Sequence, residues 1–160
     1  MLHPRRENSL LQLWFFTLFS YPCSLDLFMS LAKRIPQNHG LYFITFTCFD
    51  WIDLFEITNS YDLVYKWFDV LKSQGHHIVS YVIMPNHFHA QIAFKNSVRS
   101  INTIIGNGKR FMAYGIVKRL KEMGRNDILK RLYLNVESTD RKRGKIHEVW
   151  ESSFWWFECW

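Results

Sequence analysis

The segment Tyr81-Val-Ile-Met-Pro-Asn-His-Phe-His-Ala-Gln-Ile-Ala-Phe94 carries two histidines that flank one bulky apolar residue. Its composition is that of a β-strand, in which successive side chains point to opposite faces of the sheet. His87 and His89 are therefore expected on one face, while Phe88 points the other way, into the core. This arrangement offers two imidazoles to one metal ion. A half-exposed strand with two unrelated histidines would show the same spacing.

The residues before this segment predict two further strands and a helix. Residues 41–49 and 77–84 are rich in β-branched and aromatic side chains, so each predicts a strand. Between them, apolar residues recur at helical spacing over residues 61–73, which follow a capping pair, Asn59-Ser60. Pro85-Asn86 then interrupts the extended pattern just before the histidines, which indicates a turn between two strands.

The second half of the chain begins with a helical pattern. Apolar residues recur at helical spacing over residues 97–120, and Gly106 and Gly108 are expected to break or bend this helix. A short helix is predicted over residues 125–134, and residues 145–154 predict a last strand. The order strand–helix–strand–strand–helix–strand is that of an α+β fold of the ferredoxin-like, split βαβ type. We expect a central antiparallel sheet with its helices packed on one face.

Size and composition favour a single globular domain in a reducing compartment. The chain has 160 residues, of which 48% are hydrophobic, so it can bury a core of ordinary size. Its three cysteines are widely separated and show neither a disulfide framework nor a zinc spacing. We therefore expect a cytoplasmic protein. The cysteines are Cys23, Cys48 and Cys159.

Positive charge is concentrated in one part of the chain. The formal net charge is +6, yet residues 97–145 alone hold 13 Lys and Arg against 4 Asp and Glu, a net of +9. The remainder is slightly acidic. A basic half on such a domain is the electrostatic pattern of a nucleic-acid-binding protein. A solvated, charged helical face would produce a similar pattern.

The N-terminal residues have two interpretations. An apolar stretch over residues 10–19 follows Arg5-Arg6 and is similar to the start of a signal peptide, but it is too short to span a bilayer. The chain restarts at Met29 like an ordinary cytosolic N-terminus. We interpret residues 1–28 as an extension from an upstream start codon, outside the domain, and residues 29–160 as the domain. Neither export nor a membrane partner is expected.

The string Val82-Ile-Met-Pro-Asn-His-Phe-His89 closely resembles the histidine–hydrophobic–histidine (HUH) motif of single-tyrosine transposases. More narrowly, it is similar to the group of insertion-sequence and REP-associated tyrosine transposases. The resemblance runs from about Gly40 to Phe154 and includes the order of the elements. It implies the same ferredoxin-like fold. It also implies that His87 and His89 hold a divalent ion, Mg²⁺ or Mn²⁺, against a phosphate of single-stranded or hairpin DNA.

The same resemblance implies a third metal ligand and a nucleophile from elsewhere in the chain. The family commonly supplies a further ligand from the helix that carries the nucleophilic tyrosine; Gln91, on the histidine face, is a polar neighbour. That tyrosine attacks the phosphate to form a phosphotyrosine intermediate, and its helix follows the last strand and is often exchanged in a homodimer. No tyrosine follows Tyr133 here, and the last residue is Trp160. We therefore expect that the chain is truncated before its nucleophile, which would lie beyond Trp160. Such a chain would be inactive in cleavage.

Tyr114 is the remaining candidate nucleophile. It lies on the same predicted helical stripe as Phe111, Val117 and Leu120, which favours packing in the core over catalysis. The other tyrosines match no nucleophile position of the family.

Basic residues of the second half are expected to contact DNA phosphates, which would position the nucleic acid without reading its sequence. They are Lys109, Arg110, Lys118, Arg119, Arg141, Lys142, Arg143 and Lys145. The sequence thus predicts a DNA transposition protein of a mobile element, built on a metal-dependent HUH domain that binds single-stranded DNA. The first alternative is a decayed or domesticated DNA-binding protein without catalysis. The second is an unrelated metal-binding enzyme with a coincidental His-x-His pair.

Overall fold

A computed structural model describes residues 35, 37–151 and 155–159 of the chain, the last segment through its backbone. The predicted extension, residues 1–28, lies outside the described residues, and so does Trp160. The elements in chain order are β1 (Gly40–Thr47), η2 (Phe49–Trp51), α2 (Leu54–Ile57), α3 (Tyr61–Ser73), β2 (His77–Ile83), β3 (His87–Phe94), α4 (Ile101–Glu122), α5 (Asn126–Leu134), α6 (Ser138–Lys142) and β4 (Trp155–Cys159).

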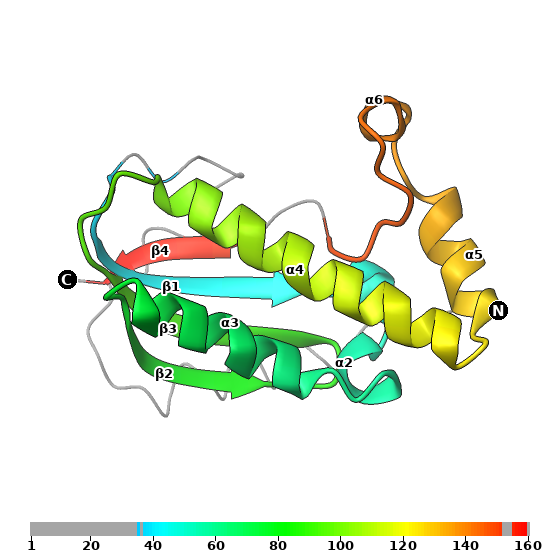
Figure 1. Cartoon of the computed structure of the whole chain (residues 1–160), viewed down its shortest axis with the longest axis horizontal. Coiled ribbons are helices and arrows are strands. Elements are labelled where there is room, and N and C mark those ends of the chain that lie inside the picture. Colours follow the sequence, from blue (N-terminus) through cyan, green and yellow to red (C-terminus); the bar gives the residue numbers. More distant parts are fainter. Residues whose placement is uncertain (1–34, 36, 152–154, 160) are drawn as a thin grey trace, which may run out of the picture.

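The four strands form one antiparallel sheet in the order β2-β3-β1-β4 (Figure 1). The helix α3 connects β1 to β2 across β3, and the helical segment after β3 leads to β4 across β1. This is the connectivity of two interleaved split βαβ units. The predicted α+β, ferredoxin-like fold is confirmed, including the antiparallel sheet and the position of the helices on one face.

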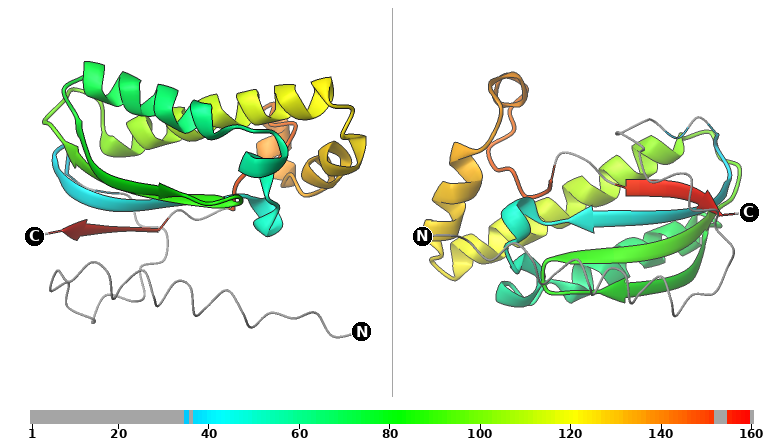
Figure 2. Two further views of the ribbon diagram at one scale, coloured as in Figure 1. Left: turned by 90° about the horizontal axis from the view of Figure 1, so that it is seen from below. Right: turned by 180° about the vertical axis from the view of Figure 1, so that it is seen from behind.

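Both long helices, α3 and α4, cover the same face of the sheet (Figure 2, left). Alternate residues of β3 are buried toward them, and the ring of Phe88 packs against the rings of Trp67 and Phe68 on α3. Because the side chains of a strand alternate, the residues between these point to the opposite face of the sheet. The apolar core thus lies between one face of the sheet and the two helices.

The helix α4 corrects two predictions. It continues without a break through Gly106 and Gly108. A Cβ added at Gly108 would lie 2.4 Å from the indole of Trp67, so this glycine permits the close approach of α4 to α3 instead of ending the helix. The buried stripe of α4 includes Met112 and Ile116, whereas Tyr114 is 71% exposed. The predicted core-packing role of Tyr114 is therefore wrong.

The last strand is also displaced from its predicted position. Residues 145–154 were expected to form it, but β4 comprises Trp155–Cys159, which pairs with β1. Before it, Trp150 makes only an isolated bridge to Cys48. The Trp150 indole packs against Phe46 and donates a hydrogen bond to the carbonyl oxygen of Lys109. The Trp150 side chain is thus buried and hydrogen-bonded to α4, while its backbone lies outside the strand β4.

The helices α5 and α6 project from the main body of the domain (Figure 1). Ile128 and Leu132 of α5 are buried, and the Leu132 carbonyl accepts a hydrogen bond from the Glu148 backbone N–H at 2.9 Å. An ion pair joins Arg131 of α5 to Asp50 of η2. We call residues 126–143 the basic arm, because α6 and the residue after it carry consecutive basic side chains. None of the helices in the described part of the chain has the length and apolarity needed to cross a membrane.

Candidate metal centre and nucleic-acid interface

His87 and His89 lie side by side on the sheet face that α3 and α4 leave uncovered. Their ring centroids are 4.9 Å apart and the ring planes make an angle of 76°. Phe88 between them is fully buried on the opposite face. The structure thus brings the two predicted ligands together at the start of a central strand, in the arrangement that their spacing predicted.

The orientation of His87 is fixed by Asn86. The Asn86 amide nitrogen donates a hydrogen bond to the backbone carbonyl of Trp51 at 3.2 Å, so its amide oxygen faces Nδ1 of His87 at 2.7 Å. An amide oxygen only accepts, which means that Nδ1 of His87 carries the proton. The neutral ring then has its lone pair on Nε2, the atom that is left for a metal ion. Burial lowers the pKa of His87 and favours this neutral form.

His89 is held by two residues of the neighbouring strand β1. Its Nδ1 lies 2.7 Å from the hydroxyl oxygen of Thr45, and its ring stacks on Phe43 with centroids 5.3 Å apart. When the Thr45 oxygen accepts from Nδ1–H, the lone pair of this ring is also on Nε2. Burial, and secondly the neighbouring His87, lower the pKa of His89 to about 4. Both imidazoles are therefore neutral near pH 7, as metal ligation requires.

The donor set suits a divalent ion that accepts nitrogen ligands. Oriented, neutral imidazoles fit Mn²⁺ better than Mg²⁺, which prefers oxygen. Within the part of the chain that the structure describes, no group of three or more His, Cys, Asp or Glu residues could hold a metal ion. Gln91 accepts a hydrogen bond from the Ser80 hydroxyl at 2.8 Å, so this residue is engaged by β2. An ion held by His87 and His89 alone would have its remaining coordination positions open to water and other oxygen ligands.

The turn η2 borders this site and was not predicted to do so. Asp50 and Trp51 both have left-handed backbone angles, with φ of 51° and 55°. For side chains other than Gly this costs about 1 to 2 kcal/mol per residue. The turn is held by a hydrogen bond of 2.7 Å from the Asp50 backbone N–H to the carboxylate of Glu151. It places the Trp51 ring in a T-shaped contact with His87, with centroids 5.6 Å apart.

The position predicted for the nucleophile, beyond Trp160, lies outside the described residues. The expected truncation therefore stays a prediction. The strand β4 begins beside Thr45, which contacts His89, and its last residue pairs with Leu41. Cys159 is thus at the end of the sheet away from the histidines.

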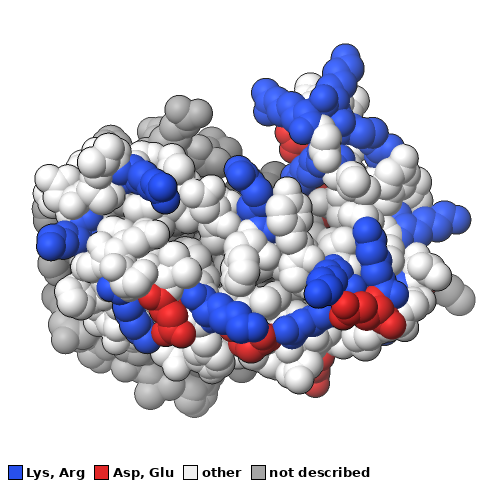
Figure 3. Space-filling view, viewed as in Figure 1, with Lys and Arg blue, Asp and Glu red and all other residues white. Residues whose placement is uncertain are grey.

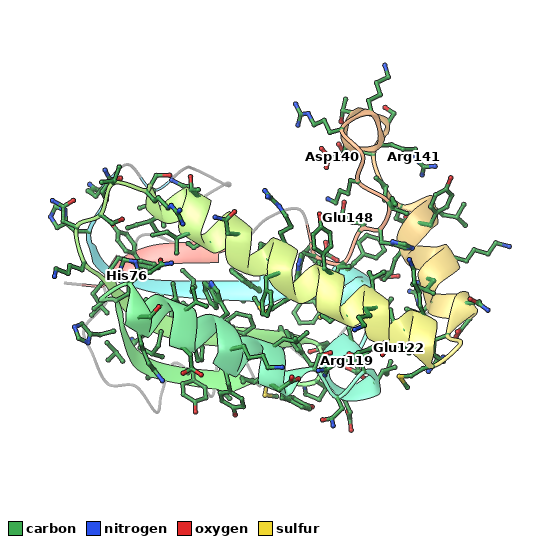
Figure 4. All side chains as sticks on the ribbon, in the orientation of Figure 1. His76, Arg119, Glu122, Asp140, Arg141 and Glu148 are labelled. Atoms are coloured by element: carbon green, nitrogen blue, oxygen red, sulfur yellow. The ribbon has the colours of Figure 1, made fainter. Side chains whose placement is uncertain are left out.

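Five of the eight predicted DNA-contacting residues have exposed side chains. Figure 3 shows Lys and Arg side chains gathered over α5 and α6. There the Arg141 guanidinium lies 4.5 Å from the centre of the Tyr133 ring and donates to the Tyr133 carbonyl oxygen at 2.9 Å (Figure 4). These contacts hold Arg141 at the surface of the basic arm. The exposed five are Arg110, Lys118, Arg141, Lys142 and Arg143.

Lys109 differs from these five because its ammonium lies inside the domain. The ammonium is 5.4 Å from the centre of the Phe46 ring and 5.9 Å from that of Trp150. It also donates to the carbonyl oxygen of Glu151 at 3.4 Å. Burial lowers the pKa of Lys109 to about 8. Its contacts are those of a core residue, not of a surface cation that meets a phosphate.

Arg119 and Lys145 are engaged in intramolecular ion pairs. Arg119 of α4 contacts the Asp62 carboxylate at 2.8 Å and so ties α4 to the start of α3 (Figure 4). The Lys145 ammonium lies 2.6 Å from the carboxylate of Glu148 and 3.3 Å from that of Asp140. These cations stabilise the domain, and a phosphate would have to compete with the carboxylates that they already contact.

The comparisons with known proteins found similar structures only. No family model and no curated protein matches the sequence. A solved REP-associated tyrosine transposase bound to a REP hairpin is similar with a TM-score of 0.48 and 15% identity, over 82% of this chain and 62% of that one. A protein from Deinococcus radiodurans R1, described only provisionally as a transposase, has a TM-score of 0.47 and 12% identity, over 82% and 86%. The chain thus spans less than two thirds of the first of these structures.

Proposed function

We propose that this chain is a transposase domain of the HUH type that binds single-stranded or hairpin DNA with the help of a divalent ion. The observation that carries the proposal is the His87–His89 pair, with its rings 4.9 Å apart on one sheet face. Asn86 contacts Nδ1 of one ring and Thr45 contacts Nδ1 of the other. This is how metal-binding histidines are usually oriented, through a hydrogen bond to the nitrogen that does not bind the metal.

The residues around the pair would prepare a DNA phosphate for reaction. A bound divalent ion would act as a Lewis acid on a non-bridging phosphate oxygen. His87 and His89 would fix its position, and Asn86 and Thr45 would keep both rings in the required tautomer. Because His89 has a pKa near 4, the pair would not need to lose a proton before binding at neutral pH.

The basic arm would hold the DNA next to this site. Arg131 of the arm pairs with Asp50 of the turn η2, and the residue after Asp50, Trp51, contacts His87. The arm is therefore fastened to the end of the sheet that carries the histidines. Arg141 and its neighbours Lys142 and Arg143 are exposed on it and can pair with phosphates along the strand. One DNA chain could contact both surfaces.

Tyr114 does not supply the nucleophile in this proposal. It lies on α4, which packs on the face of the sheet opposite to His87 and His89 (Figure 2). The decayed or domesticated DNA-binding protein remains the alternative. It would use the same ion and DNA surface but form no covalent intermediate, so an assay for a protein–DNA adduct separates the two.

The metal site is tested by isothermal titration of the full chain with Mn²⁺. We expect binding by the wild type and none by the double variant His87→Ala/His89→Ala. The matched control is His39→Ala/His77→Ala, which removes two exposed histidines at the other end of the sheet, where Gly40 pairs with Phe94 and His77 with Ala93. Equal binding by the wild type and the His87/His89 variant would show that the pair is not a metal site.

A further inference from the structure

We propose that Trp51 is a stacking subsite for one nucleobase, namely the base next to the phosphate held at His87. The inference rests on the proposed function, because it assumes DNA at the histidine pair. It adds a residue that the HUH motif does not contain and a second kind of contact, with a base instead of a phosphate.

The first observation is the exposure of the indole at the metal site. Trp51 is 43% exposed, and its ring makes a T-shaped contact with His87, with centroids 5.6 Å apart and an interplanar angle of 72°. A large part of Trp51 is therefore open to contact with another aromatic group. Among the side chains that the structure describes, the other exposed aromatic residues lie elsewhere: Phe111 and Tyr114 are on α4, Tyr133 is on α5, and Tyr65 and Tyr81 contact each other. Trp51 is thus placed where the base of a bound nucleotide would arrive.

The second observation is the backbone that presents the ring. Asp50 and Trp51 have φ values of 51° and 55°, a conformation that a bulky side chain such as Trp rarely adopts. Such conformations persist when their surroundings enforce them, and they occur preferentially at functional sites. Here the Asp50 backbone N–H donates to Glu151 at 2.7 Å, and the Asp50 carboxylate pairs with Arg131. The fold therefore maintains an unfavourable turn that keeps a large apolar ring at the surface.

The third observation is that the same turn is fastened to the metal ligand. The Trp51 carbonyl accepts a hydrogen bond of 3.2 Å from Asn86, whose amide oxygen accepts from Nδ1 of His87 at 2.7 Å. The Asn86 side chain thus contacts both the backbone of Trp51 and the imidazole of His87, which fixes the two residues relative to each other. A phosphate at His87 and its adjacent base on Trp51 would be positioned as one unit.

Stacking of this kind recognises a base without reading its identity. Every base has a π-face, so an aromatic platform accepts all four, and removing the platform weakens binding by about 5- to 150-fold per base. The subsite would therefore position any unpaired nucleotide at the ion and would exclude a base that remains stacked in a duplex. Its substrate class is an unpaired nucleotide within single-stranded or hairpin DNA.

The test measures the affinity of the full chain for a fluorescent hairpin DNA with a single-stranded tail, in Mn²⁺, by anisotropy. In parallel oligonucleotides, one tail base at a time is replaced by an abasic site. We expect one position at which loss of the base weakens binding by at least about fivefold. Trp51→Leu should weaken binding of the intact DNA by a similar factor and show no further loss at that abasic position. Trp51→Phe should keep most of the affinity.

Phe111→Leu is the matched control, because Phe111 is 45% exposed but lies on the opposite side of the sheet. It should bind both DNAs like the wild type. Equal affinity of Trp51→Leu and the wild type for intact DNA, or equal sensitivity of both to every abasic site, would overturn the stacking subsite. The metal titration separates this failure from failure of the proposed function: a wild type that binds Mn²⁺ and the hairpin, but with the DNA affinity of Trp51→Leu, would overturn the stacking subsite alone. A wild type that binds neither Mn²⁺ nor the hairpin would overturn both.

Discussion

The amide oxygen of Asn86 lies 2.7 Å from Nδ1 of His87, and the amide nitrogen of the same side chain is held by the Trp51 carbonyl at 3.2 Å. The Trp51 carbonyl can only accept a hydrogen bond, so it must face the amide nitrogen of Asn86. The amide oxygen of Asn86 then faces His87 and accepts the proton on Nδ1. The tautomer of His87 is therefore determined by a backbone group two contacts away from the ring. A residue that binds no metal itself would thereby control a metal ligand.

Asn86→Ala should weaken Mn²⁺ binding by about tenfold, since the loss of a group that orients a ligand commonly costs 10- to 100-fold in metal affinity. Without the amide, His87 can rotate and adopt either tautomer. Isothermal titration measures the change. Asn107→Ala, which alters an exposed asparagine on α4, is the control and should bind Mn²⁺ normally. Unchanged affinity of Asn86→Ala would mean that the His87 ring is fixed by its packing alone.

Replacement of the three consecutive basic residues of the arm should reduce the salt dependence of DNA binding. With about five phosphates contacted by single-stranded DNA, the slope of log affinity against log salt should be near −3 to −4, at roughly −0.7 per phosphate. The triple variant Arg141→Gln/Lys142→Gln/Arg143→Gln should flatten it by up to about 2. The control Lys66→Gln/Lys72→Gln/Lys95→Gln removes the same charge elsewhere. A slope that changes equally in both variants would argue against the arm as the DNA surface.

Asp62→Asn should lower the free energy of unfolding by about 1 kcal/mol at pH 7. Arg119 contacts Asp62 at 2.8 Å, and this hydrogen-bonded pair, as the largest cause, lowers the pKa of Asp62 to about 2. Since the folded pKa is below the unfolded one, the unfolded state binds more protons between about pH 4 and pH 2, and the stabilisation is lost as the pH falls through that window. The two proteins should thus converge near pH 2 in urea unfolding. Asp69→Asn, whose partner Lys72 is on the surface, should have almost no effect.

Lys109→Met should leave DNA affinity unchanged and keep the domain at least as stable as the wild type at pH 7. Burial lowers the pKa of Lys109 from 10.5 to about 8, so folding opposes its charged form. Between pH 8 and 10.5 the unfolded state holds a proton that the folded state has released, so wild-type stability should rise with pH relative to the variant. Urea unfolding at pH 7 and pH 10 measures this difference. A large loss of DNA affinity in Lys109→Met would instead support the predicted phosphate contact.

The strand pattern allowed the fold and the histidine pair to be predicted. The alternation in β3 is strict, with every second residue buried, so a period of two placed His87 and His89 correctly. The helix α4 was harder because two apolar series run through it. One contains Phe111 and Tyr114 and is exposed; the other contains Met112 and Ile116 and is buried. The larger side chains suggested the first series, but the close approach of α3 at Gly108 selects the second.

The turn at Trp51 could not have been predicted from its residues. Asp tolerates left-handed backbone, so Asp50 permits it, but nothing in the sequence Cys48-Phe-Asp-Trp-Ile52 signals it at Trp51. The conformation is enforced by Glu151, Arg131 and Asn86, which are distant in sequence. The partners of Lys109 are likewise long-range, so its burial was not visible in a basic stretch. Contacts between distant segments, not local preference, therefore decided both outcomes.

Tyr114→Phe should leave DNA binding and any strand cleavage as in the wild type. The Tyr114 side chain is 71% exposed on α4, and the sheet lies between that helix and the histidine pair. A nucleophile must be aligned with the phosphate and close to it, which this position does not allow. A labelled hairpin DNA incubated with Mn²⁺ and analysed on a denaturing gel should give the same pattern for both proteins. An adduct present in the wild type and absent in Tyr114→Phe would show that the helix α4 can present this residue to the metal site after all.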